Sequence, residues 1–241
     1  MGTQGTLWVV GGGSGMGRAA AVVAAQKGWN VAVTGRRADA VSETASLIRT
    51  AGGDALEVPA DARDEASLSE AHKRIVGHWG PVTAVVLAAG LNAPARTWGD
   101  QNIGEFAAII DTNLTSVARV IDLVLPGMRA QGQGNIVVVS SRAAWRFSPG
   151  SGVAYMTSKT GLSALVASLN DQEGANGIKA CHLCPGDVDT DFLSMRPEVP
   201  DAGQRSKMLS AEDIARSVQF ILDSPQHVRI DELALSPIGQ R

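Results

Sequence analysis

Short apolar runs alternate with longer helical patterns along the whole 241-residue chain. The apolar runs are nearly continuous, which is typical of parallel strands that are buried on both faces of a sheet. Helices that connect such strands cover the two faces of the sheet. The pattern therefore predicts an α/β fold, a doubly wound, Rossmann-type parallel sheet of about seven strands, in a single domain over residues 1–241. The expected strands are 7–10, 30–34, 55–58, 83–88, 136–139, 178–184 and 233–235.

Two helical patterns are long, and one stretch has no periodicity. Apolar residues recur at three- and four-residue steps from 106 to 128, which predicts one continuous helix, and a second helix is expected over 153–171.

Residues 194–209 contain two prolines and a glycine and no helical pattern. Long irregular stretches in compact domains are commonly either functional or disordered, so we expect this segment to be a substrate lid, with a disordered loop as the alternative.

Charge and composition exclude several classes of protein. Lys and Arg number 21 against 24 Asp and Glu, so the chain lacks the basic excess of a nucleic-acid-binding protein. No stretch approaches the roughly 18 consecutive apolar residues of a transmembrane helix, and no secretory signal pattern is present. We therefore expect a cytoplasmic protein that binds neither nucleic acid nor a membrane.

The two cysteines, Cys181 and Cys184, have the spacing of redox and metal motifs. Both fall in an expected strand, where residues i and i+3 point to opposite faces. A zinc site of this type also needs a second pair of ligands, which we do not find in the sequence. We therefore predict neither a metal site nor a disulfide framework.

A glycine-rich turn joins the first expected strand to the first helix. It reads Gly-Gly-Gly-Ser-Gly-Met-Gly over residues 11–17. Glycine permits a tight turn and a close backbone approach, and the helix N-terminus that follows offers N–H groups to a pyrophosphate. The turn therefore predicts a dinucleotide site. The residues expected to bind the cofactor here are Gly11, Ser14, Gly15, Met16 and Gly17.

The second expected strand ends in Gly35-Arg36-Arg37, with no acid before Asp39. NAD-binding folds often place an acid at this point to bind the 2′-hydroxyl of the ribose. Two guanidinium groups instead suit a 2′-phosphate, because they donate bidentate hydrogen bonds. We therefore predict that the cofactor is NADP, bound by Arg36 and Arg37, with NAD as the alternative.

A tyrosine and a lysine stand four residues apart at the start of the expected helix 153–171. Tyr155 is the only tyrosine of the chain, and Lys159 shares its helix face. A cation beside a phenol stabilises phenolate, so we expect Lys159 to lower the pKa of Tyr155 from about 10 toward neutrality. Ser141 follows the fifth strand at the carboxyl edge of the sheet, where doubly wound folds bind their ligands.

Taken in this order, the motifs resemble those of the short-chain dehydrogenase/reductase family over nearly the whole chain. The family pattern T-G-x-x-x-G-x-G is matched except that Val10 replaces the threonine. The gap from Ser141 to Tyr155 is 14 residues, where the family more often has about 13. The family's N-N-A-G stands here as Leu-Ala-Ala-Gly, which lacks both asparagines and keeps Gly90.

This resemblance implies a role for each matched residue in catalysis. Ser141 binds the substrate oxygen, and Tyr155 exchanges a proton with it. Lys159 holds the nicotinamide ribose, and Asn113 positions a water that resupplies the proton. The C-terminal sequence resembles a branch that includes 3-hydroxy acid dehydrogenases and small-aldehyde reductases.

The resemblance also implies further cofactor contacts and an assembly. Asp61 is expected at the adenine, and Val188 and Thr190 at the nicotinamide carboxamide. Assembly into a homotetramer through the two long helices is implied as well. The remaining implied cofactor-binding residues are Ala62, Gly90, Pro185 and Gly186.

Together these observations predict an enzyme, an NADP-dependent oxidoreductase that transfers a hydride between NADPH and a small-molecule carbonyl or alcohol. The alternative is a nucleotide-sensing regulator on the same fold, although relatives of that kind tend to lose the tyrosine or the lysine. Arg142 and Arg146 follow Ser141 in the sequence, and their guanidinium groups suit an anionic group on the substrate. The alternative is that both arginines are solvated and do not contact the substrate. We also expect Trp98, Trp145 and Met195 to line the substrate pocket.

Overall fold

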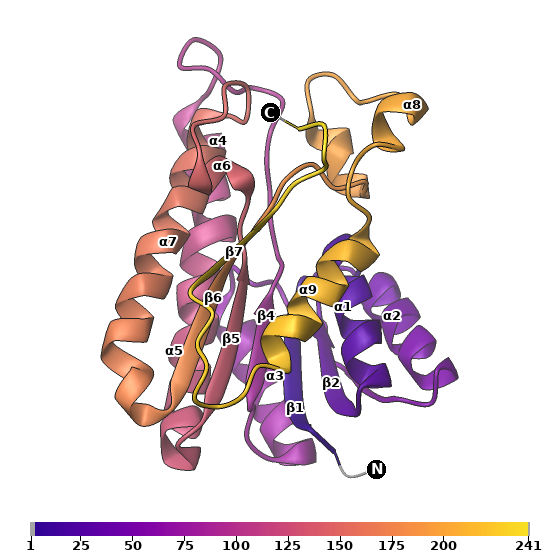
Figure 1. Cartoon of the computed structure of the whole chain (residues 1–241), viewed down its shortest axis with the longest axis vertical. Helices are drawn as coiled ribbons and strands as arrows, with labels where there is room; N and C mark the ends of the chain where they lie inside the picture. The colour runs from indigo at the N-terminus through magenta and orange to yellow at the C-terminus, as the bar shows by residue number, and fades with distance from the viewer. Residues whose placement is uncertain (1–2, 241) are drawn as a thin grey trace.

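A computed structural model describes residues 3–240 and places them in one sheet with helices on both faces (Figure 1). The sheet has seven strands in the order β3-β2-β1-β4-β5-β6-β7, and every neighbouring pair is parallel. The predicted doubly wound fold is therefore confirmed. The strands are β1 Gly5–Val10, β2 Trp29–Thr34, β3 Asp54–Glu57, β4 Ala84–Leu87, β5 Gly134–Val139, β6 Ile178–Pro185 and β7 Glu232–Leu235.

Two layers of helices cover the sheet. One layer consists of α1, α2 and α9, and the other of α3, α5 and α7. No helix within the described residues is long and apolar enough to cross a membrane. The α-helices are α1 Gly15–Gln26, α2 Ala38–Thr50, α3 Glu65–Trp79, α4 Ile103–Ile110, α5 Ser116–Gln131, α6 Arg142–Trp145, α7 Val153–Glu173, α8 Ala202–Arg205 and α9 Ala211–Leu222.

Successive residues of the central strands face opposite helix layers, and both sides are apolar. In β1, Leu7 and Val9 pack with α1, α2 and α9, whereas Trp8 and Val10 pack with the other layer. The buried indole N–H of Trp8 donates to the hydroxyl of Thr34 at 2.8 Å, so this polar atom is satisfied. Burial on both faces explains why the strands read as continuous apolar runs in the sequence.

The helix predicted over 106–128 is interrupted, which corrects the sequence prediction. Between α4 and α5, residues Asp111–Thr115 form the π-helical turn η1. The side chain of Asn113 in this turn is fully buried and bonds to both backbone groups of Leu91, outside the helix. A π-helical turn adds one residue without ending the helix, so three- and four-residue apolar spacing does not reveal it.

Residues 194–209 are also more ordered than the sequence predicted. They contain the end of the 3₁₀ turn η3 Asp191–Met195 and the short helix α8. Asp201 and Gln204 form a capping box at the start of α8, directly after Pro197 and Pro200. Figure 1 shows α8 above the carboxyl ends of the strands, on the side where the chain also ends.

An ion pair joins the carboxyl ends of α5 and α7. Arg129 binds both carboxylate oxygens of Glu173, and Asn176 donates to the same carboxylate at 2.8 Å. These hydrogen bonds lower the pKa of Glu173 to about 2. Because that value lies below the ordinary 4.5, the stabilisation is complete above about pH 4.5 and is lost as the pH falls toward 2.

We expect Glu173→Gln to lower the melting temperature at pH 7 and to flatten the loss of stability between pH 4.5 and 2. Thermal unfolding followed by circular dichroism across this range measures both effects. Glu70→Gln, at an exposed position of α3, is the matched control and should keep the wild-type acid profile. A Glu173→Gln profile parallel to the wild type would contradict the role of this carboxylate.

Candidate active site

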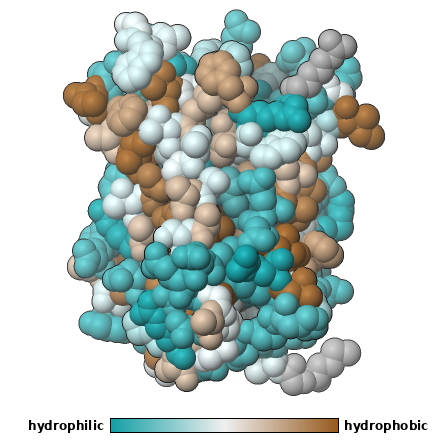
Figure 2. Space-filling model, turned by 60° about the vertical axis from the view of Figure 1, so that its left-hand side comes forward, coloured by the Kyte–Doolittle hydropathy of each residue, from teal (hydrophilic) through white to brown (hydrophobic). Residues whose placement is uncertain are grey.

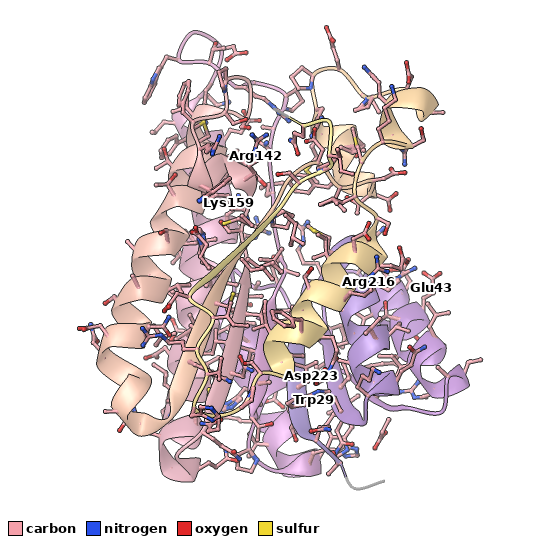
Figure 3. All side chains as sticks on the ribbon, in the orientation of Figure 1. Trp29, Glu43, Arg142, Lys159, Arg216 and Asp223 are labelled. Atoms are coloured by element: carbon pink, nitrogen blue, oxygen red, sulfur yellow. The ribbon has the colours of Figure 1, made fainter. Side chains whose placement is uncertain are left out.

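A cleft of about 1180 Å³ runs across the carboxyl ends of the central strands. It crosses the point between β1 and β4 where the strand order changes direction, which is where doubly wound sheets bind nucleotides. Lys159 from α7 and Arg142 from α6 lie at this end of the sheet (Figure 3). Of the predicted catalytic and cofactor-binding residues, the cleft brings together all except Asn113. These residues are Gly11, Ser14, Gly15, Met16, Gly17, Arg36, Arg37, Asp61, Ala62, Gly90, Ser141, Tyr155, Lys159, Pro185, Gly186, Val188 and Thr190.

The glycine turn forms one end of the cleft, and its conformation requires glycine. Gly11 has φ +88°, and a Cβ there would lie 2.4 Å from the nitrogen of Ala89. A Cβ on Gly17 would lie 2.2 Å from the carbonyl oxygen of Gly11. Arg18 donates to the carbonyl of Gly13 at 2.7 Å and thereby holds the turn. This close packing brings the N-terminus of α1 directly under the cleft.

The first N–H groups of α1 are available to a ligand. Ser14 is the N-cap residue, with extended backbone, and its side chain makes no capping hydrogen bond within the described residues. The first turn also has no acidic residue. An uncapped helix N-terminus with its partial positive charge suits a phosphate group.

Two exposed arginines stand where β2 leads into α2. Neither Arg36 nor Arg37 forms an ion pair within residues 3–240. Across this end of the cleft, Asp61 accepts hydrogen bonds from the backbone and the guanidinium of Arg63. The pKa of Asp61 is lowered chiefly by Arg63 and further by the charge of Arg36. The carboxylate predicted to bind adenine is thus already engaged by an arginine.

Tyr155 and Lys159 lie on successive turns of α7 and face the cleft together. The Nζ atom of Lys159 is 5.8 Å from the centre of the Tyr155 ring and donates to the carbonyl of Val139 at 3.0 Å. Ser141 ends the connection from β5 and caps α6, where its hydroxyl accepts from the N–H of Ala143 at 3.1 Å. A phenol, an ammonium and a hydroxyl therefore converge beside the carboxyl end of β5.

The structure corrects the predicted shift of the tyrosine pKa. Burial raises the pKa of Tyr155, opposed by a hydrogen bond with Ser141 and by the charges of Arg96 and Arg196. Burial also lowers the pKa of Lys159 to about 8. The desolvation of the phenol is the larger effect here, and it outweighs the neighbouring cations that favour phenolate.

Asn113 lies beneath the cleft and does not line it. Its amide nitrogen donates to the carbonyl of Leu91 at 2.9 Å and to the hydroxyl of Ser158 at 3.0 Å. The Ser158 hydroxyl in turn donates to the carbonyl of Tyr155 at 2.7 Å. Asn113 therefore connects the segment after β4 to the first turn of α7, and its role in a water relay stays a prediction.

The segment after β6 closes the other side of the cleft. Pro185 ends β6, and the N–H of Gly186 donates to Leu235 of β7 at 2.6 Å. Val188 pairs with Leu209 in a parallel bridge. Thr190 approaches the glycine turn, since its Cγ2 atom would lie 3.4 Å from a Cβ on Gly15. The P-G-x-V-x-T segment thus faces the α1 N-terminus across the cleft.

Sequence reasoning missed an arginine that organises the mouth of the cleft. The guanidinium of Arg96 donates to the carbonyls of Ala93, Gly150 and Met195, each at 2.9 Å. These three carbonyls belong to three separate segments of the chain. Arg96 lies in an irregular loop, and no motif or periodicity singles it out.

The aromatic lining also differs from the prediction. Met195 lines the cleft as expected, but Trp98 and Trp145 do not. Phe147 and Phe192 line it instead, and the ring of Phe192 is 6.0 Å from that of Tyr155. Phe147 is also one of the exposed large hydrophobic residues, and Figure 2 shows such hydrophobic side chains scattered among hydrophilic ones on one face of the molecule.

Comparisons with known proteins agree with this geometry. A model of the short chain dehydrogenase family matches residues 6–199. The chain is 29% identical over 230 residues to an uncharacterized oxidoreductase of Staphylococcus epidermidis, covering 95% of this chain and 96% of that protein. It is also 29% identical over 234 residues, 95% of its length, to glycine betaine reductase ATRR of Emericella nidulans, of which it spans only 18%.

Solved structures show the same architecture. An alcohol dehydrogenase from the archaeon Thermococcus sibiricus, complexed with 5-hydroxy-NADP, superimposes with a TM-score of 0.86 at 28% identity. The match covers 98% of this chain and 97% of that one. Levodione reductase has the same fold, with a TM-score of 0.91 at 23% identity over 98% of each chain.

Proposed function

The chain belongs to the short-chain dehydrogenase family and is an oxidoreductase that moves a hydride between a nicotinamide cofactor and a carbonyl or alcohol, and on this premise we propose that the cofactor is NADP(H). Arg36 and Arg37 support the proposal, because they are exposed at the end of β2 and lack ion-pair partners within residues 3–240. A 2′-phosphate accepts bidentate hydrogen bonds from such groups. NAD is the alternative.

The shape of the cleft supports a dinucleotide along its whole length. The uncapped N-terminus of α1 suits the pyrophosphate, and the segment Val188–Thr190 lies opposite, at the end near Tyr155. A nicotinamide held beside Val188, Thr190 and Tyr155 would supply hydride chemistry to a carbonyl or an alcohol. Gly11 and Gly17 allow the turn beneath the cofactor to pack tightly, because a side chain at either position would collide with neighbouring backbone.

We assign the proton chemistry to Ser141, Tyr155 and Lys159. Ser141 and Tyr155 bind the substrate oxygen, and Tyr155 donates its proton as the oxygen gains charge. The raised pKa keeps the phenol protonated at neutral pH, which is the form that carbonyl reduction requires. Lys159 is buried beside the ring and carries the positive charge that stabilises phenolate once the proton has left.

One observation carries this assignment: a phenol, an ammonium and a hydroxyl from two elements line one cleft with the glycine turn. A regulator that only senses nucleotides does not need this convergence, so that alternative is not favoured. The direct test is the purified protein incubated with NADPH or NADH and a panel of ketones, aldehydes and keto acids. Substrate-dependent loss of NADPH absorbance is expected, and its absence with every class of carbonyl would contradict the proposal.

We further propose that the substrate carries an anionic group. Arg142 and Arg146 both line the cleft, and the Arg146 guanidinium lies 4.6 Å from the Trp145 ring centre. We expect Arg146→Ala to lower kcat/KM for a keto acid by at least about tenfold and to spare its methyl ester, because a charged hydrogen bond contributes about 1.5–3 kcal/mol. Equal losses on acid and ester would contradict this choice of substrate.

The homotetramer, the substrate lid and the cytoplasmic location are predictions from the sequence, and we retain them as proposals. The exposed side chains of α7 before Asp171 are small, which allows a close approach of the same helix from a second copy, as a homotetramer requires. Sedimentation velocity at micromolar concentration tests this, and a monomer contradicts it. Residues 194–209 are proposed as the substrate lid and the cytoplasm as the location. The small exposed residues of α7 are Thr157, Thr160, Ala164, Ala167 and Ser168, and the exposed residues nearer the carboxyl end of α7 are Asp171 and Gln172.

A further inference from the structure

A second hollow, a groove of about 800 Å³, lies between α7 and the edge strand β7. It shares no lining residue with the active-site cleft. His182 of β6 and Glu232 of β7 line its floor. Behind them lies Cys184, which is fully buried and has no role in the proposed reaction.

The backbone forces these three side chains together. His182 and Cys184 are two residues apart on β6, so both point to the face covered by α7. Glu232 is the direct register partner of His182 in the parallel β6–β7 pair, so its side chain emerges beside the imidazole. Three donor atoms thus converge from two paired strands, with no contribution from a loop.

The distances suit a metal ion. The Nδ1 atom of His182 is 3.0 Å from the Oε2 atom of Glu232 and 3.3 Å from the Sγ atom of Cys184. All three donors lie within 4.8 Å of one another. Zinc bonds of about 2.0–2.3 Å to nitrogen, oxygen and sulfur at tetrahedral angles need donor separations of roughly 3.3–3.6 Å. Small side-chain movements therefore complete the geometry.

The chemistry of the donor set is equally specific. Imidazole, thiolate and carboxylate together favour zinc or a similar thiophilic divalent ion, whereas magnesium and calcium prefer oxygen alone. Cys184 and His182 are buried, so they are shielded from water, while Glu232 is partly exposed to the groove. The open side of the cluster leaves a fourth position for water.

We propose that His182, Cys184 and Glu232 form a binding site for a zinc-class divalent metal ion, with its fourth position open to the groove beside α7. Binding replaces the thiol proton of Cys184, which is released to solvent, and uses the neutral imidazole of His182 through Nδ1. The bound ion joins β7 to β6 by side-chain bonds in addition to the backbone ladder. The sequence prediction of no metal site considered Cys181 with Cys184 and did not include Glu232.

Burial sets a condition on this site. The Cys184 thiol is fully buried, and it binds a metal ion only as the thiolate, after losing its proton. Metal binding therefore competes with a proton, and the affinity must rise with pH. This dependence distinguishes a thiolate site from binding by surface carboxylates alone.

The test is a titration of the full chain, freed of metal with a chelator, with cobalt(II) as a spectroscopic probe and zinc as the competitor. We expect one ion per chain, a thiolate-to-cobalt absorption band, displacement by zinc, and a higher melting temperature with zinc. None of these readouts depends on enzymatic activity, so the result is independent of the proposed reaction.

Three substitutions make the test specific to these residues. Cys184→Ser should remove the band and weaken zinc binding by more than the 10- to 100-fold that a group outside the first coordination shell costs. Glu232→Gln, at a partly exposed position, should weaken binding without unfolding the strand. Cys181→Ser, on the opposite face of β6, is the matched control and should bind as the wild type does.

Two results would overturn the proposal. The first is the absence of a thiolate band with the folded wild-type chain at saturating cobalt. The second is metal binding that Cys184→Ser and Cys181→Ser affect equally, or that Glu232→Gln leaves unchanged.

Discussion

Tyr155→Phe is expected to lower kcat by at least about 100-fold, the lower range for loss of a general acid–base group. The substitution keeps the ring, its 6.0 Å contact with Phe192 and the start of α7, and it removes only the hydroxyl. The affinity for NADPH should stay within a few-fold, because the glycine turn and Arg36 are untouched. Steady-state kinetics on the best carbonyl, with NADPH binding followed by fluorescence, separates the two quantities.

The control for this variant is Gln172→Ala, at an exposed position near the carboxyl end of α7. It should keep wild-type turnover, which shows that α7 tolerates a local change. Near-normal turnover of Tyr155→Phe would exclude the tyrosine as the acid. A tenfold loss of NADPH affinity in Tyr155→Phe would instead point to a structural role.

Arg36→Ala should weaken NADPH binding by about 10- to 150-fold and change NADH binding little. A charge-assisted hydrogen bond contributes about 1.5–3 kcal/mol, and each 1.4 kcal/mol is about tenfold in affinity. Only NADPH carries the 2′-phosphate, so the loss should appear as a change in the ratio of the two dissociation constants. Isothermal titration with both cofactors measures that ratio.

Arg49→Ala provides the charge-matched control for Arg36→Ala. Arg49 lies on α2, where it pairs with Glu57 at 2.8 Å, and it does not line the cleft. Its loss changes the net charge equally without removing a candidate phosphate ligand. A wild type that prefers NADH, or equal losses for both cofactors in Arg36→Ala, would refute the assignment of Arg36 to the 2′-phosphate.

The sequence predicts the parts of this molecule that depend on local pattern. Buried parallel strands are continuous apolar runs, so the order of strands and helices follows from periodicity. The glycine turn and the Tyr155–Lys159 pair depend on spacing within one segment, and the structure places both at the cleft. The π-helical turn around Asn113 could not be predicted, because it changes the hydrogen-bond pattern but not the apolar spacing.

Contacts between distant segments could not be predicted either. Glu232 meets His182 only because β7 pairs with β6 in one register, and no local signal specifies that register. The raised pKa of Tyr155 likewise reflects its three-dimensional burial rather than the lysine beside it in the helix. Arg96 has no motif, and its importance appears only when its three acceptor carbonyls are known.

The hydrogen bonds of Arg96 limit how the substrate range of this protein can be changed. One guanidinium holds the loop after β4, the turn before α7 and the end of η3, so these segments do not vary independently. A graft of residues 194–209 from a relative must therefore present a carbonyl where Met195 has one, or the other two segments lose a shared anchor. Exchanging all three segments as a set preserves the anchor, and this makes the rim of the cleft one exchangeable unit.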